Sequence, residues 1–178
     1  MNNEKEPFYV PSQPWLYLVE AEPSEVTNFG WSLANNESLH VSVRFLRGKR
    51  MTDLDSLFNE FAAALQFPYY FGENWAAFDE CLADIDWMKA DAYVLIVMDM
   101  NSVLSKEDRG QFATLIDILQ KVADEWSQPV DTVEVWGRPA KAFHVIFQVS
   151  PFDLEEAQHR LKSAGGVFQK LELRKSKV

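Results

Sequence analysis

Two neighbouring carboxylates, Asp79 and Glu80, lie in a segment rich in large aromatic side chains. Tyr69 and Tyr70 precede them, and Trp87 follows. Carboxylates form charge-assisted hydrogen bonds with the Arg, Lys or His side chains of a partner, and large amphipathic rings anchor protein interfaces. The alternatives are core packing for the rings and a solvated helix face for the carboxylates. The residues around these side chains distinguish a binding surface from core packing and from a solvated helix face.

Residues 67–75 predict an aromatic loop that leads into a helix over about 74–86. Pro68 disfavours helix for the residue before it, Gly72 permits a sharp or positive-φ turn, and Asn74 is able to cap the next helix. Apolar residues then follow at spacings of 3, 4 and 3, which predicts one buried stripe: Trp75, Phe78, Leu82 and Ile85. The opposite face carries Ala76, Glu80, Ala83 and Trp87, with Asp79 and Asp86 at its edge.

This stretch resembles the barstar family, protein inhibitors that block bacterial ribonucleases of the barnase type. The family pattern is a hydrophobic-Pro-x-Tyr-[Tyr/Phe]-Gly-x-Asn segment followed by a helix that ends in Asp-Cys-Leu. The positions that fit are Pro68, Tyr70, Phe71, Gly72, Asn74, Trp75, Ala77, Phe78, Cys81 and Leu82. In the order of elements, the resemblance covers roughly residues 40–150.

The resemblance implies a protein-binding site and a basic protein toxin, a ribonuclease domain, as its partner. The site would comprise Tyr69, Tyr70, Gly72, Asn74, Ala76, Asp79, Glu80, Ala83 and Trp87. Glu80 stands where the family has its key Asp. Ala76 and Lys121 stand where the inhibitor of barnase has a second interface Asp and a Glu, so the partner is expected to differ from close relatives of barnase. The alternative is a module with the same fold whose partner is a non-nuclease toxin or a regulatory protein.

The charge of the chain agrees with a basic partner. The 178 residues include 17 basic and 27 acidic side chains, a net charge of −10, which attracts basic proteins at long range and disfavours direct contact with nucleic acid. The hydrophobic fraction of 47% argues against disorder. A single cysteine fits a reducing compartment, and neither a signal peptide nor a membrane span is expected. We therefore expect a cytoplasmic protein.

An enzymatic function has little support in the sequence. Cys81 lies on the stripe side of its helix, which favours a buried, unreactive thiol. His40, His144 and His159 are far apart and show no metal-ligand spacing. No phosphate-binding glycine loop or Gly-x-Ser-x-Gly motif is present. We expect no catalysis, no metal and no cofactor.

The pattern of the whole chain predicts an α/β fold: a small parallel sheet with packed helices, extended by N- and C-terminal strands and a C-terminal helix. Strands are expected over 15–19, 39–46, 92–98, 143–149 and 167–173, with a strand or connection over 132–136. Besides the motif helix, helices are expected over 55–66, 108–126 and 154–163, and one helical turn over 22–28. Thr52 or Asp53 is the candidate cap of the helix over 55–66, Asp153 is the candidate cap of the last helix, and Gly165-Gly166 is expected to end it.

The expected organisation is one globular unit with three parts. Residues 1–39 form an N-terminal extension packed on the core, residues 40–150 the barstar-like domain, and residues 151–178 a C-terminal helix-strand extension.

Overall fold

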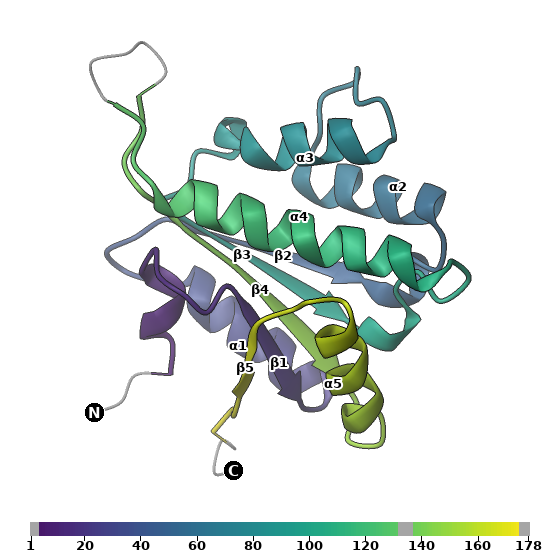
Figure 1. Cartoon of the computed structure of the whole chain (residues 1–178). Coiled ribbons are helices and arrows are strands. Elements are labelled where there is room, and N and C mark those ends of the chain that lie inside the picture. Colours follow the sequence, from purple (N-terminus) through teal and green to yellow (C-terminus); the bar gives the residue numbers. More distant parts are fainter. Residues whose placement is uncertain (1–3, 132–136, 175–178) are drawn as a thin grey trace.

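The computed structural model describes residues 4–131 and 137–174, and a five-stranded sheet forms its centre (Figure 1). The strands are β1 (Leu16–Glu20), β2 (Val41–Arg47), β3 (Ala92–Met98), β4 (Ala142–Val149) and β5 (Phe168–Leu171). They lie in the order β2-β3-β4-β1-β5, and every neighbouring pair is parallel. The predicted α/β class with a parallel sheet is confirmed. The strand or connection predicted over 132–136 lies outside the described residues.

Helices connect and flank these strands. In the described part of the chain they are α1 (Pro23–Ala34), α2 (Leu54–Leu65), α3 (Trp75–Ala83), α4 (Arg109–Ser127) and α5 (Leu154–Ser163). Short 3₁₀ helices also occur: η1 (Glu6–Tyr9), η2 (Gly48–Arg50), η3 (Asp86–Met88) and η4 (Met100–Ser102). The helices predicted over 55–66, 108–126 and 154–163 are confirmed to within one residue at each end.

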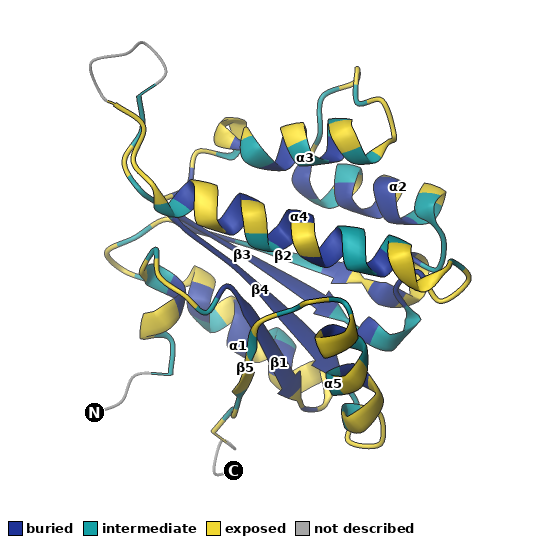
Figure 2. Cartoon of the chain, viewed as in Figure 1, coloured by how far each residue is buried: buried dark blue, intermediate teal, exposed yellow. Residues whose placement is uncertain are grey.

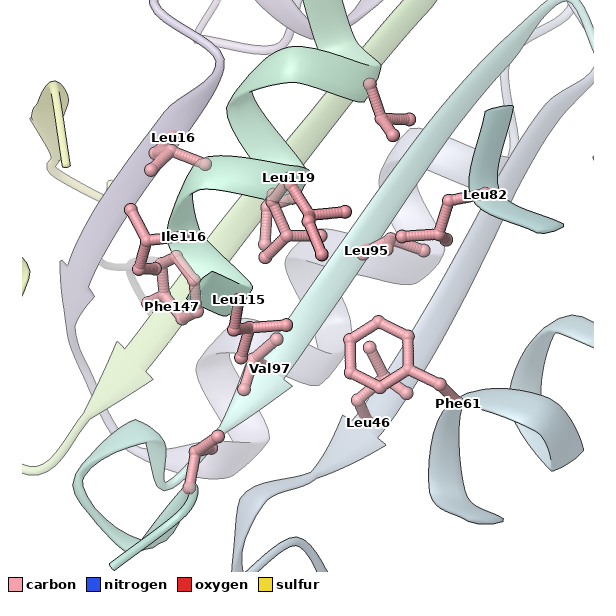
Figure 3. Close-up of a cluster of buried hydrophobic side chains, with 14 of the residues drawn as sticks. Leu16, Leu46, Phe61, Leu82, Leu95, Val97, Leu115, Ile116, Leu119 and Phe147 are labelled. Atoms are coloured by element: carbon pink, nitrogen blue, oxygen red, sulfur yellow. The ribbon is translucent and has the colours of Figure 1, made fainter. Parts of the chain in front are cut away.

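Both faces of the sheet are covered, and each face has its own hydrophobic cluster (Figure 2). Helices α2, α3, α4 and α5 pack on one face, where the cluster includes Leu46, Phe61, Leu82, Leu95, Val97, Leu115, Leu119 and Phe147 (Figure 3). Helix α1 and η1 pack on the other, with Phe8, Tyr17, Val26, Phe29, Leu33, Val94 and Ile146. This double cover explains why β3 is a continuous apolar run rather than an alternating one.

Helix α1 is longer than the sequence suggested. One helical turn was expected over residues 22–28, whereas a single helix spans Pro23–Ala34. Glu22 and Glu25 form a reciprocal capping box at its start. Gly30 allows close approach to the sheet, because a Cβ there would lie 2.6 Å from both Phe45 and Ile96. Tertiary packing therefore completes a helix whose polar residues give it only modest intrinsic propensity.

Helix α3 is shorter than predicted. It ends at Ala83, and the chain continues through Asp84 into the 3₁₀ turn η3. Ile85 is buried as expected, but it lies between the two helices. Trp87 is held in η3 because its indole N–H donates to the carbonyl oxygen of Leu65 at 3.0 Å. The prediction that one helix carries Ala76, Glu80 and Trp87 is therefore wrong for Trp87.

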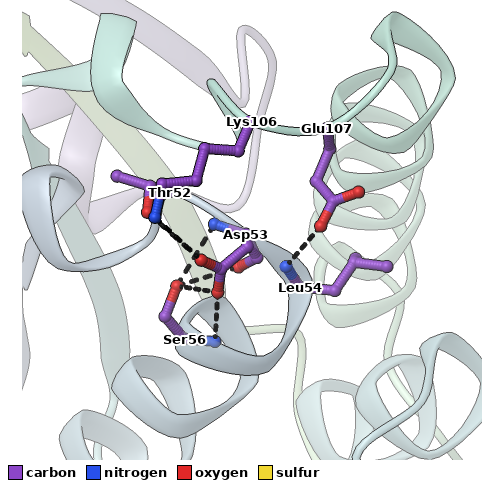
Figure 4. A network of polar contacts seen from close by, with 6 residues as sticks. All are labelled: Thr52, Asp53, Leu54, Ser56, Lys106 and Glu107. Atoms are coloured by element: carbon purple, nitrogen blue, oxygen red, sulfur yellow. Dashed lines mark hydrogen bonds and ion pairs between the residues drawn. The ribbon is translucent and has the colours of Figure 1, made fainter.

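The two predicted Asp caps behave differently. Asp53 caps α2, because its carboxylate accepts from the amide of Ser56 at 3.1 Å, and Ser56 Oγ is 3.2 Å from the amide of Asp53. Lys106 and Glu107 complete this network from the segment before α4 (Figure 4). Asp153, in contrast, makes no side-chain cap for α5, because its carboxylate accepts from Ser150 Oγ instead. The cap predicted at Asp153 is wrong.

The segment before β2 contributes to the centre of the fold. Strand β1 lies between β4 and β5, paired in parallel with both. His144 on β4 holds the N-terminal arm, since its Nε2 lies 3.1 Å from the Val10 carbonyl oxygen and its Nδ1 lies 3.1 Å from that of Pro14.

Gly165 follows α5 at a φ of 77°, a conformation that glycine adopts without strain. The last helix therefore ends near the predicted glycine pair.

Candidate protein-interaction site

The loop between α2 and α3 presents two tyrosines to solvent. Phe67 and Phe71 point into the fold, with ring centroids 5.0 Å apart, and Phe71 also packs edge-on against Phe58. The Phe71 amide donates to the Pro68 carbonyl oxygen at 2.9 Å, which closes the turn. Between these anchors, Tyr69 is 101% exposed and Tyr70 is 73% exposed. Core packing, the alternative considered for both rings, is wrong.

Asn74 fixes the junction between the loop and α3. Its side-chain oxygen accepts from the Ala77 amide at 3.0 Å, and its amide group donates to the Gly72 carbonyl oxygen at 3.0 Å. This confirms the predicted cap. Gly72 was considered able to form a sharp or positive-φ turn, and the positive φ of this loop occurs at Glu73, with φ of 49°. A Cβ on Gly72 would lie 3.1 Å from the Asn74 amide nitrogen, so glycine leaves room for the capping side chain.

Two indole bonds hold α3 against α4. Trp75 Nε1 donates to Gln111 Oε1 at 2.8 Å, and Trp126 Nε1 donates to the Leu82 carbonyl oxygen at 3.0 Å. Phe78, on the same side of α3, is fully buried. The opposite side of α3 is consequently directed outward, in a fixed orientation relative to the tyrosine loop.

The two carboxylates of α3 have different environments. Glu80 is exposed and has no ion-pair partner among the described residues. Asp79 faces α4, where its Oδ2 lies 2.5 Å from Lys121 Nζ, and Glu125 contacts the same ammonium at 3.7 Å. The hydrogen bond from Lys121 to Asp79 raises the pKa of the lysine. The structure therefore pairs Asp79 with the cation that the sequence interpretation had treated as a separate feature.

The remaining predicted site residues surround Glu80. Ala76 is exposed and Ala83 is half-buried on the same helix. Trp87 is 38% exposed at the end of η3 and packs edge-on against Phe67, which supports the loop. The tyrosines, α3 and Trp87 thus form one continuous part of the molecule at the α2–α3 end.

Sequence reasoning missed two further carboxylates, Glu73 and Asp84. Both are exposed, and neither has an ion-pair partner in the part of the chain that the structure describes. Glu73 lies in the loop just before the Asn74 cap, and Asp84 directly follows the last residue of α3, so the two carboxylates flank the helix that carries Glu80. We define the acidic stripe as Glu73, Glu80 and Asp84.

The described residues of this site offer neither an exposed thiol nor a set of metal ligands. Cys81 is buried, and burial, followed by the nearby charges of Glu80 and Asp84, raises the pKa of its thiol. Residues 4–131 and 137–174 hold no group of three or more His, Cys, Asp or Glu residues able to bind a metal ion. No described helix has the length and apolar character needed to span a membrane.

One known structure shares the fold at low sequence identity, and a second is less similar. No curated protein sequence matches the chain. The Aeropyrum pernix ORC2 protein, solved in ADPNP–ADP complexes, is similar with a TM-score of 0.56 and 12% identity, over 89% of this chain and 41% of that one. Drosophila ORC bound to AT-rich DNA and Cdc6 has a TM-score of 0.45 and 14% identity, over 96% and 50%. This chain thus spans at most half the length of either protein, and the first likeness concerns the fold alone.

A family model gives the more specific match. The model of the Barstar family, described as barstar (barnase inhibitor), matches residues 41–148. That range runs from the first residue of β2 to the last but one of β4, and it contains the tyrosine loop, α3 and the acidic stripe. The match agrees with the range suggested by the motif, and it covers more than half of the sequence. The chain belongs to the barstar family.

Proposed function

We propose that this protein is a non-catalytic inhibitor that binds and occludes the active site of a bacterial ribonuclease toxin, as an antitoxin or immunity protein in the cytoplasm. The observation that carries the proposal is the placement of two exposed tyrosines, Tyr69 and Tyr70, beside the acidic stripe. Both features lie within the segment that matches the barstar family.

Binding would combine burial of the rings with charge complementarity. Tyrosine rings bury a large area with few rotatable bonds, and interface hot spots are enriched in Tyr and Trp. The carboxylate of Glu80, with Glu73 and Asp84 beside it, would take the place of RNA phosphates against the cationic groups of the toxin. Because this mechanism works by occupation of the site, it needs neither turnover nor a cofactor.

The Asp79–Lys121 pair would limit the range of partners. Lys121 forms ion pairs with Asp79 and Glu125 and neutralises part of their charge, so the surface between α3 and α4 offers little net negative charge. A toxin cation placed at Ala76 would meet a methyl group and stay unpaired. These two features favour a partner other than a close relative of barnase. They also support the second candidate, the same binding surface directed to a non-nuclease toxin or a regulatory protein.

The proposal is tested by inhibition of purified ribonuclease domains of the barnase type, with RNA cleavage and calorimetric affinity as readouts. For the domain that is inhibited, Tyr70→Ala and Glu80→Ala should each weaken binding by about 2 kcal/mol, the loss typical of a central interface residue, while the fold is kept. Phe152→Ala and Glu155→Ala are matched controls, because both residues are exposed, follow the carboxyl end of β4 and lie outside the proposed site, so they should leave affinity unchanged.

Two results would count against the inhibitor. If Glu80→Ala binds as tightly as the parent protein, the acidic stripe does not occupy the active site. If affinity capture from the native host returns a basic partner without ribonuclease activity, the second candidate replaces the first.

A further inference from the structure

A groove lies on the opposite side of the sheet from the tyrosine loop. It is a groove of roughly 660 Å³ between the N-terminal arm and β5, with Glu6, Pro7, Pro14, Tyr17, Leu171 and Glu172 among its lining residues. We call it the arm groove. Tyr17 and Leu171 belong to the hydrophobic cluster under α1, whereas α3 packs on the other face. A ligand in the arm groove and a partner on α3 would therefore not compete for space.

The floor of the groove contains a polar atom without a partner. Tyr17 is 3% exposed, and its ring packs 4.7 Å from that of Phe8 and 5.8 Å from that of His144. Its hydroxyl has no hydrogen bond to any described residue, and it is not completely shielded from solvent. Because Tyr17 lines the groove, we infer that the hydroxyl borders it. Burial raises the pKa of Tyr17, which keeps the hydroxyl protonated. A buried phenol normally has a partner, and a ligand in the groove that Tyr17 lines would be able to supply one.

The charge of the groove is negative. Glu6 and Glu172 have no ion-pair partner among the described residues, while Glu4 accepts from the Arg174 backbone amide at 3.3 Å. Lys170 is the one basic residue on the described lining. The described lining thus holds three carboxylates, those of Glu4, Glu6 and Glu172, against one ammonium group. The groove therefore presents carboxylates to a cationic group.

The walls of the groove are apolar. Pro7, Val10, Pro14 and Leu171 line it between the carboxylates and the floor. Lys and Arg side chains bury their aliphatic stems along such surfaces and keep the charged end at polar groups. The combination of apolar walls, carboxylates and a free hydroxyl matches a long basic side chain better than it matches a small inorganic cation.

Strand β5 supplies a further binding element. It pairs with β1 on one side, and no described strand pairs with its other edge (Figure 1). The backbone groups along a free strand edge are able to hydrogen-bond an added extended peptide. The groove runs beside residues 169–172, so a peptide on this edge would carry its side chains directly over it.

We propose that the arm groove binds an extended basic peptide segment of another protein. Its main chain pairs with the free edge of β5. One Lys or Arg side chain lies between Pro7 and Pro14, donates a hydrogen bond to the Tyr17 hydroxyl, and is neutralised by Glu6 and Glu172.

The test measures fluorescence anisotropy of a labelled hexapeptide of alternating Val and Arg, with alternating Val and Gln as the uncharged control. The parent chain should bind the basic peptide and not the neutral one. Tyr17→Phe removes only the hydroxyl, and it should weaken binding about tenfold, the effect of one charge-assisted hydrogen bond. Its melting temperature should stay equal or rise, because the lost group had no partner in the protein.

Charge variants separate the groove from the general acidity of the chain. Glu6→Gln/Glu172→Gln should weaken binding about tenfold, whereas Glu37→Gln/Glu155→Gln, with the same change in net charge at exposed remote positions, should change it less than twofold. Backbone amide NMR signals of Gln169–Leu171 should shift on binding. Equal effects of the two charge variants, parent-like binding by Tyr17→Phe, or shifts confined to α3 would overturn the proposal.

Discussion

Aromatic side chains form two clusters on opposite faces of the sheet, and the two clusters differ in what they accomplish. Under α1, Phe8 and Tyr17 pack against His144 and Phe29 packs against Phe8, with ring centroids 4.7 to 5.8 Å apart, and these rings close a core. Beside α2 and α3, Phe58, Phe67, Phe71 and Phe78 pack at 5.0 to 6.1 Å. Beyond that second cluster, the two tyrosines of the loop stay in solvent.

The difference follows from local backbone geometry rather than from residue type. In the loop, the turn from Pro68 to Phe71 directs Phe67 and Phe71 inward, so the two residues between them point outward. In the N-terminal arm, Phe8 lies on a short 3₁₀ turn that faces the sheet. An aromatic-rich segment therefore indicates a binding surface only when its anchoring residues and its exposed residues can be separated.

The largest effect is expected from Phe8→Ala. Phe8 is fully buried and contacts three other rings of its cluster. Its truncation should lower the free energy of unfolding by about 3–4 kcal/mol, because it removes apolar burial and leaves a cavity. Denaturant unfolding gives this value. Partner binding by the folded fraction should stay unchanged, and a parallel loss of binding would show that the two clusters are coupled through the sheet.

The next effect concerns the charge between α3 and α4. Ala76→Asp/Lys121→Glu adds two carboxylates and removes the cation that neutralises Asp79. We expect the parent to inhibit barnase weakly or not at all, and the double variant to bind it more tightly by about 2 kcal/mol, since new carboxylates would pair with toxin cations. Inhibition kinetics against barnase measure the change.

Lys121→Gln is the control for that variant. It frees Asp79 without adding a carboxylate, so its gain should be smaller than that of the double variant. Tight inhibition of barnase by the parent would show that this surface does not set partner choice.

Much of the fold was predictable because buried strands and helix faces require apolar residues, which form recognisable patterns in the sequence. The apolar run at 92–98 gave β3 with correct ends, since both faces of that strand are covered. The stripe of α4 was equally clear, whereas the sequence left Thr52 or Asp53 open as the cap of α2, and the cap is Asp53. Helix α1 was not, because its completion depends on the contact of Gly30 with Phe45 and Ile96, which only the folded chain brings together.

The candidate site was predictable as a segment but not as a set of charges. The family pattern located the tyrosines and Glu80, and the structure places these side chains at the surface. The pairing of Asp79 with Lys121 joins residues 42 positions apart. Local spacing carries no information on such a contact, so the sequence interpretation placed Asp79 in the binding site and treated Lys121 separately, as a position where the chain differs from the inhibitor of barnase.

A smaller effect should appear in the pH dependence of stability, with a different window on each side of the sheet. Under α1, burial lowers the pKa of His144 below its ordinary value of 6.5. The unfolded chain therefore binds a proton more readily than the native state, and stability falls as the pH drops below about 6.5. On the other side, the bonds from Ser56 lower the pKa of Asp53 to about 2, and the hydrogen bond from Arg47 lowers that of Glu60.

For these two carboxylates, the stabilisation is complete above the unfolded values of 3.8 and 4.5. It is lost as the pH falls, toward about 2 in the case of Asp53. Melting temperatures from pH 8 to 2 should therefore decline in two stages. His144→Gln should remove the upper stage and Asp53→Asn should reduce the lower one. A decline in a single stage would contradict this separation. So would a change in both stages by either variant.

The smallest effect is expected at Asp153, and it compares two helix starts of similar sequence. Asp53 caps α2 through the Ser56 amide, so Asp53→Ala should lower the melting temperature. Asp153 bonds to Ser150 Oγ and to no amide of α5, whose first turn already carries Glu155 and Glu156 in favourable positions for the helix dipole. Asp153→Ala should therefore change the free energy of unfolding by at most about 0.5 kcal/mol, as for an exposed substitution. A loss of about 1 kcal/mol, the usual cost of a missing cap, would mean that Asp153 turns to cap α5 in solution.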